Sequence, residues 1–68
     1  MTQAERIREY MHDFGSITPM DTFRDLGITK LATRISEMRA NGEIIFGEPV
    51  PFENRYGEKR KFMRYWLG

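Results

Sequence analysis

Apolar residues in the first part of the chain recur at intervals of three and four positions. They are Ile7, Tyr10, Met11 and Phe14. This spacing puts the four side chains on one face of an α-helix, while the charged residues between them occupy the other faces. The pattern therefore predicts an amphipathic helix over about residues 3–14.

Both ends of this helix carry boundary signals. Thr2 is followed three positions later by Glu5, the spacing of a capping box in which each side chain accepts a hydrogen bond from an otherwise unpaired amide. Gly15 supplies the left-handed residue that ends a helix. Ile17 then lies where a short extended segment can pair with a later hairpin.

A second, shorter helix is predicted over about residues 19–25. Thr18 is placed to cap it, Pro19 fits its first turn because no N–H is needed there, and Gly27 ends it. Its apolar members are spaced three apart and so share one face: Met20, Phe23 and Leu26.

The third helix is expected over about residues 30–40, with Thr29 as its cap. Its inward stripe consists of Leu31, Ile35 and Met38. It follows the second helix after only Leu-Gly-Ile-Thr, in which Ile28 offers an apolar plug. A turn this short that contains glycine forces two helices to cross steeply, so the pair is typical of a helix-turn-helix.

The sequence changes character after Asn41-Gly42. Residues from about 43 to 67 predict a β-hairpin that turns near Tyr56-Gly57. One face of its return strand would hold Met63, Tyr65 and Leu67, and the other Phe62, Arg64 and Trp66. The chain is thus predicted to be a single domain, residues 1–68, mostly α with a C-terminal β-hairpin. This α+β order is that of a three-helix winged helix-turn-helix.

Composition argues against several classes of site. The 68 residues include no cysteine and one histidine, which excludes disulfides and thiolate metal sites. The paired acids, Glu5 with Glu9 and Asp21 with Asp25, are typical of solvated helix faces, and His12 is interpreted as a surface or capping residue. No nucleophile–base pair, phosphate-binding glycine loop or converging set of metal ligands is visible. We therefore expect no enzyme activity, cofactor, metal or small-molecule substrate.

Charge is distributed unevenly along the chain. Residues 1–28 carry three basic and five acidic side chains, a net charge of −2, whereas residues 29–68 carry eight and five, a net charge of +3. Within residues 55–64 there are five basic side chains and one acidic side chain, a net charge of +4. The positive field is therefore local to the predicted hairpin.

One face of the third helix is small, polar and modestly basic. Opposite the inward stripe lie Thr29, Lys30, Thr33, Ser36 and Glu37, with Arg34 at the flank. Such a helix fits the major groove, where Lys or Arg can donate to guanine, Thr can contact a thymine methyl and Glu can accept from cytosine. Any surface helix is polar outside, but the tight turn and the hairpin favour DNA recognition. The predicted contacts are Thr29, Lys30, Thr33, Arg34 and Glu37.

The basic end of the hairpin has two interpretations. Its candidate DNA contacts are Arg55, Tyr56, Lys59, Arg60 and Lys61. As a wing, these residues would contact phosphates or enter a minor groove and add affinity without sequence readout. As a structural device, charges on an exposed strand discourage edge-to-edge aggregation. The clustering of four positive charges near one turn favours the wing.

Two large aromatic residues, Phe62 and Trp66, lie on the outer face of the return strand. They either cover the hairpin or mark a dimer or partner surface. The sequence does not separate the two interpretations.

Three stretches resemble a family of small winged helix-turn-helix domains found mainly in bacteriophages, prophages and bacteria. They are TQAERIREYM, GSITPMDTFRDLGITKLATRISEMRANGEII and ENRYGEKRKFMRYWL, so the similarity covers nearly the whole chain. The Ser-Ile-Thr-Pro entry with Leu-Gly-Ile-Thr-x-Leu-Ala-x-Arg-Ile is the more specific match, and Asn-Arg-Tyr-Gly lies at the wing. The resemblance implies a winged helix with a DNA-binding role, without a particular operator or pathway.

The chain departs from similar sequences at two places. Thr22 stands where they usually have a small alanine, so its hydroxyl must find a backbone carbonyl or face water. The segment FGEPVPFEN contains Pro49 and Pro51, which a regular wing strand disfavours. We therefore expect the first wing strand to be broken or bowed.

Together these features favour a DNA-binding protein, a phage, prophage or bacterial transcriptional regulator. Its third helix would read the major groove of double-stranded DNA while the wing contacts the backbone. The alternatives are a winged-helix module for protein–protein interaction and an excisionase-like architectural DNA binder. One domain of 8.1 kDa rarely covers a long operator, so we expect a homodimer or a second protein on the DNA. The sequence shows neither a signal peptide nor a membrane span, so we expect a cytoplasmic protein, nucleoid-associated when bound to DNA.

Overall fold

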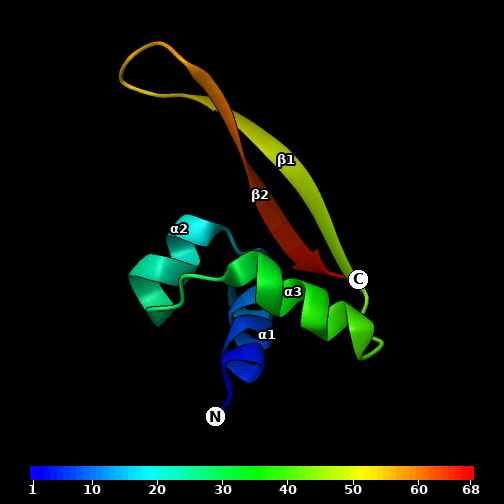
Figure 1. The fold of residues 1–68 in the computed structure, drawn as a ribbon. Helices are drawn as coiled ribbons and strands as arrows, with labels where there is room; N and C mark the ends of the chain where they lie inside the picture. Colours follow the sequence, from blue (N-terminus) through cyan, green and yellow to red (C-terminus); the bar gives the residue numbers. More distant parts are fainter.

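The computed structural model describes residues 1–68 as three helices followed by an antiparallel hairpin (Figure 1). The elements are α1 (Gln3–Phe14), α2 (Pro19–Asp21) with its π-helical continuation η1 (Thr22–Leu26), α3 (Leu31–Ala40), β1 (Ile45–Glu53) and β2 (Lys59–Leu67). The predicted α+β order of a winged helix is confirmed. None of the helices combines the length and the apolar composition needed to cross a membrane.

The helix ends follow the local chemistry of the sequence. Thr2 Oγ1 accepts a hydrogen bond from the Glu5 amide at 3.1 Å, and the Glu5 carboxylate accepts one from the Thr2 amide, which confirms the predicted capping box. Thr18 and Asp21 form the same motif at the start of α2. Gly15, with a φ of 85°, ends α1 in the left-handed conformation.

One apolar core lies where the three helices meet the base of the hairpin. Its buried members are Ile7, Met11, Ile17, Ile28, Leu31, Ile35, Met38, Ile45 and Tyr65. The inward stripe predicted for the third helix and the plug at Ile28 are confirmed. Full burial of one such side chain stabilises the fold by about 1.5–3 kcal/mol, so this cluster supplies the main favourable contribution.

The apolar stripes of the first two helices extend beyond the core. The side chain of Phe14 is 71% exposed, and its ring packs against that of Tyr10 with 4.6 Å between centroids. Met20 and Phe23 are also largely exposed, and of their predicted common face only Leu26 packs against the core. Met20 and Phe23 lie on the outer surface because a different side of the helical segment 19–26 is buried.

Thr22 occupies that buried side with no solvent exposure. Its Oγ1 donates to the carbonyl oxygen of Thr18 at 2.7 Å, so the hydroxyl has found a backbone carbonyl, the first of the two alternatives left by the sequence. The same carbonyl accepts from the Thr22 amide at 3.0 Å. A hydroxyl bound to the carbonyl of the preceding turn competes with the regular helix ladder, and the π-helical η1 begins at this residue.

We expect Thr22→Val to lower the free energy of unfolding by about 1 kcal/mol, because it keeps the shape of the side chain and removes one buried hydrogen bond. Urea denaturation measures the change. Thr33→Val is the matched control, since Thr33 is exposed and its replacement should cost less than about 0.5 kcal/mol. Equal effects of the two substitutions would show that the Thr22 hydroxyl does not stabilise the fold.

The first wing strand was expected to be broken or bowed. It is not broken, because its register runs through Pro49 and Pro51. Tyr65 exchanges both of its backbone hydrogen bonds with Ile17, at 2.8 and 2.9 Å, which confirms the predicted pairing of Ile17. The backbone groups of Tyr65 therefore point outward, away from β1. In an antiparallel pair such outward positions alternate with inward ones, so the β1 residue opposite Tyr65, and every second residue of β1 from there, also turns its backbone groups away from β2. Both prolines occupy such positions on β1, where a missing N–H breaks no ladder bond.

Candidate nucleic-acid interface

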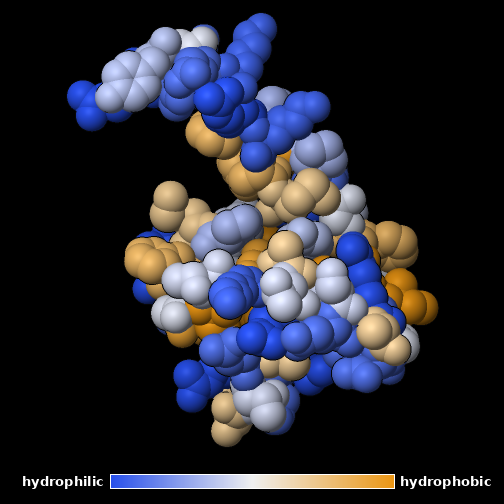
Figure 2. All heavy atoms as spheres, in the orientation of Figure 1, coloured by the Kyte–Doolittle hydropathy of each residue, from blue (hydrophilic) through white to orange (hydrophobic).

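The outer face of α3 is open to solvent. Its exposed residues are Thr29, Lys30, Thr33, Ser36 and Glu37, and Arg34 is half-buried at the flank. In Figure 1 this helix runs across the front of the helical body, and Figure 2 shows mainly hydrophilic surface over it. The residues selected from the sequence therefore share one accessible surface, which we call the α3 face.

Thr29 does not cap α3, contrary to prediction. The N-cap residue is Lys30, whose side chain makes no capping hydrogen bond, and the helix begins one residue later than expected. A polar hollow of about 270 Å³ lies at this end, lined by Gln3, Gly27, Ile28, Thr29, Lys30 and Arg34. Amides of a first helical turn without a side-chain partner attract anionic groups, and the two basic side chains strengthen this field.

Arg34 and Glu37 are paired with each other on the α3 face. Arg34 Nη1 donates to the two Glu37 carboxylate oxygens at 2.9 and 2.7 Å, and Nε donates to Gln3 Oε1 at 2.9 Å. The guanidinium is thus held in place from α1, and its Nη2 group is left without a partner in the protein. Sequence reasoning missed Gln3 because the two residues are 31 positions apart, and no local pattern signals such a contact.

The hairpin extends well beyond the helices. The molecule measures 38 × 21 × 20 Å, and Figure 1 shows the loop end standing clear of the helical body. Asn54 Oδ1 accepts hydrogen bonds from the amides of Tyr56 and Glu58 at 2.9 and 3.0 Å, and Gly57 takes a φ of 77°. The turn therefore lies where it was predicted, and these bonds fix the loop that carries Arg55.

All five residues assigned to the wing from the sequence are exposed. Their charges are not equally available, because Arg60 Nη2 is paired with Glu58 Oε2 at 3.0 Å. Arg55, Lys59 and Lys61 form no ion pair within the protein. Three of the four basic residues at the hairpin end are therefore outside any ion pair in the protein.

Two ionic clusters hold the helices behind these surfaces. Arg8 donates to both oxygens of Glu43 at 2.6 and 2.7 Å, and this pairing lowers the pKa of the Glu43 carboxyl. Asp25 accepts hydrogen bonds from the Arg24 guanidinium and, at 2.6 Å, from the Tyr10 hydroxyl, and the two together, Arg24 first, lower its pKa to about 2. The acid at position 25, interpreted from the sequence as a solvated helix face, therefore links η1 to α1.

Acid is expected to destabilise the protein through these two carboxyl groups. Each has a folded-state pKa below its unfolded value, so its contribution is complete above the ordinary pKa and is lost as the pH falls through the folded one. The free energy of unfolding should therefore fall between about pH 5 and pH 2. Urea denaturation across this range should show a smaller loss for the Asp25→Asn, Glu43→Gln double variant than for the parent protein. Equal losses would contradict this assignment.

Phe62 and Trp66 of β2 each pack against an aromatic residue of β1. The ring of Phe62 lies 5.7 Å from that of Phe52, and the ring of Trp66 lies 6.1 Å from that of Phe46, measured between centroids. Both pairs lie on the hairpin face opposite to that of Tyr65, and the Phe52–Phe62 pair also lines a cleft beside α2. The interpretation of the same residues as a partner surface stays a prediction.

No three histidine, aspartate or glutamate side chains lie close enough together to share a metal ion. His12 is on the surface, with Nδ1 3.4 Å from the Asp13 carboxylate. Its position agrees with the interpretation as a surface residue.

Comparison with known protein families identifies a match. A family model described as a winged helix-turn-helix domain matches residues 2–68. No curated protein and no solved structure matched the chain. Membership of this family suggests DNA binding, and winged helix-turn-helix domains are typically not enzymes.

Proposed function

The chain belongs to the winged helix-turn-helix domain family, and from this premise we propose that it is a phage, prophage or bacterial transcriptional regulator that binds double-stranded DNA. The α3 face would enter the major groove while the hairpin contacts the phosphate backbone. One observation carries the proposal. An unobstructed polar helix face and a projecting hairpin end with three unpaired cations occur in the same small molecule.

Base readout is assigned to the α3 face. Lys30 has no carboxylate partner and can donate to guanine, and Thr33 can contact a thymine methyl. Arg34 is held at its Nε and Nη1 atoms, so its Nη2 group is the part that would reach a base or a phosphate. Glu37 would either accept from cytosine, after releasing Arg34, or keep that arginine in place.

Backbone contacts are assigned to two places. The first-turn amides of α3, with the polar hollow beside them, can donate to a phosphate. Arg55, Lys59 and Lys61 can each neutralise a phosphate along the hairpin, while Arg60 must first leave Glu58. Tyr56, which is 77% exposed, can donate to a phosphate or stack.

Two lysine variants separate base recognition from sequence-independent electrostatic attraction to DNA. We expect Lys30→Ala to change the sequences enriched from a random DNA library, with a loss of about 1–3 kcal/mol of discrimination at one base position. The matched substitution Lys59→Ala should lower affinity for all sequences and leave the preference unchanged. Sequencing of bound DNA measures both effects. A uniform loss of affinity in both variants would contradict base reading by the α3 face.

We propose that a homodimer or a second protein completes the complex on DNA, because single modules of this size bury only about 600–1,000 Å² of protein surface. Sedimentation of the protein with a defined duplex would give the stoichiometry. An excisionase-like architectural role predicts strong bending of the duplex, which circular permutation of the site would measure. The proposed locations are the cytoplasm and, on DNA, the nucleoid.

A further inference from the structure

The outer edge of β2 is open beyond its short pairing with Ile17. Because Tyr65 turns its backbone groups toward Ile17, the alternating residues Met63, Lys61 and Lys59 turn theirs in the same direction. The sheet has only two strands, and the Ile17 bridge is the only isolated pairing beside them. Three consecutive outward N–H and C=O positions on β2 therefore have no strand next to them, which is the arrangement that accepts an added strand.

The opposite edge of the hairpin is closed to strand addition. On β1 the outward positions include Pro49 and Pro51, neither of which has an N–H to donate. The outward carbonyl of Ile45 already accepts two hydrogen bonds from Arg39, at 3.1 and 2.7 Å. An incoming strand can therefore pair only along β2.

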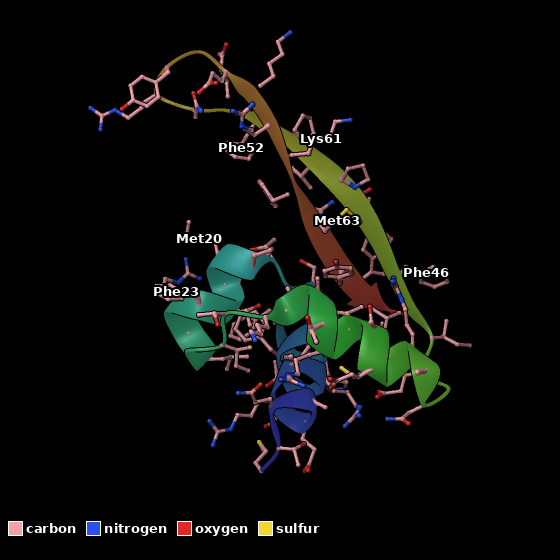
Figure 3. All side chains as sticks on the ribbon, viewed as in Figure 1. Met20, Phe23, Phe46, Phe52, Lys61 and Met63 are labelled. Carbon is pink, nitrogen blue, oxygen red and sulfur yellow. The ribbon has the colours of Figure 1, made fainter.

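A cleft lies beside the open edge. It has a volume of about 490 Å³ and is lined by Thr18, Pro19, Met20, Asp21, Phe52 and Phe62. Figure 3 shows Met20 and Phe52 on either side of the gap between α2 and the outer half of the hairpin, and Figure 2 shows the same hollow below the hydrophilic loop end. The wall carries mainly apolar surface, and its one acid, Asp21, is already bound by the Thr18 amide and by Arg24.

A second copy of the chain is a poor occupant. Its β1 edge lacks the donors, as described above. Pairing of two β2 edges about a twofold axis would place Lys61 against Lys61, Lys59 against Lys61, or Arg60 against Arg64 in the available antiparallel registers. Like charges directly opposite each other destabilise a sheet.

We infer that this edge binds an extended segment of a partner protein that runs antiparallel to β2 and in which acidic and apolar residues alternate. Residues of the added strand opposite Lys59 and Lys61 lie on the same face as these lysines and are favoured as Asp or Glu. The intervening residues lie on the face of Phe62 and enter the cleft, so they are favoured as apolar. This binding mode shares Lys59 and Lys61 with the proposed DNA binding but does not depend on it, and its test contains no DNA.

The probe is a labelled peptide, acetyl-Val-Glu-Val-Glu-Val-Glu-amide, added to the full-length protein. Fluorescence anisotropy should show saturable binding, and NMR should show shifts of the backbone amides of residues 59, 61 and 63. N-methylation of the Glu amides, which face β2, should weaken binding at least about 10-fold, whereas N-methylation of the Val amides should be tolerated. Equal affinities of the two methylated peptides would overturn the inference, because charge attraction alone does not distinguish one methylated peptide from the other. Shifts confined to the α3 face would also overturn it.

A protein variant tests the same edge. Lys61→Pro removes one outward N–H at the position opposite Pro51, where the ladder to β1 is not affected, and should weaken peptide binding at least about 10-fold. Lys61→Ala keeps the N–H and should weaken it less than about 5-fold, as expected for the loss of one exposed charge. Equal affinities of the two variants would overturn the inference. Circular dichroism checks that Lys61→Pro is folded, and the methylated peptides decide the question if it is not.

Discussion

Replacement of Arg55, Lys59 and Lys61 by alanine in one variant is expected to weaken DNA binding roughly 500-fold at about 0.1 M salt. Each phosphate contact contributes about 0.9 to the slope of log K against log salt, so the loss of three contacts lowers the slope by about 2.7. These three cations are the ones on the hairpin end that form no ion pair within the protein. Fluorescence anisotropy with a labelled duplex at several salt concentrations measures both quantities.

Arg6→Ala is the control for this experiment. Arg6 is exposed on α1 and also lacks an ion-pair partner, so the variant loses a charge of the same kind at a different place. Its salt slope should stay within about 0.3 of the parent value, because exposed charges farther away than a Debye length of about 10 Å are screened. A per-charge loss of affinity equal to that of the hairpin variant would mean that the wing has no special role.

Ile35→Ala is expected to destabilise the fold by about 3–4 kcal/mol. Ile35 is 1% exposed at the centre of the core, and truncation of such a side chain removes buried apolar surface and leaves a cavity. A domain of this length has a total stability of only about 3–10 kcal/mol, so much or all of the protein should unfold at room temperature. Urea denaturation followed by circular dichroism measures the loss.

The same substitution at Ile44 provides the comparison. Ile44 is 69% exposed, so Ile44→Ala should change the free energy of unfolding by less than about 0.5 kcal/mol. The contrast isolates burial from residue type. Similar losses at both positions would contradict the assignment of Ile35 to the core.

Features set by short-range chemistry could be predicted from the sequence. The capping box of Thr2 and Glu5, the third-helix stripe and the turn near Gly57 depend on residues within a few positions of one another. The pairing of Ile17 with the hairpin also follows from local pattern, because a lone apolar residue between two helices has few other ways to be buried.

Contacts between distant residues that no local pattern signals could not be predicted. The hold of Gln3 on Arg34 joins α1 to α3, and nothing near either residue indicates it. The exposure of Met20 and Phe23 accompanies the burial of Thr22, which lies on another side of the same helical segment. In each case the position of the side chain depends on its tertiary contacts, which the hydrophobic periodicity of the sequence does not specify.

The prolines of β1 show how the same residue can have opposite consequences. Their presence suggested a broken or bowed strand, because proline removes a donor. The register puts both at outward positions, so the ladder is intact and the removed donors protect the free edge. The outcome depends on whether the prolines occupy outward or inward positions of the strand, and the sequence does not fix this alternation.

The proposed role depends on the α3 face and the hairpin end contacting the same duplex. Titration of the ¹⁵N-labelled protein with a duplex taken from the selected library tests this directly. We predict the largest backbone amide shifts at residues 29–37 and 55–61, with little change on the exposed side of α1. Shifts confined to α1, or to the hairpin alone with the α3 face unchanged, would contradict the account.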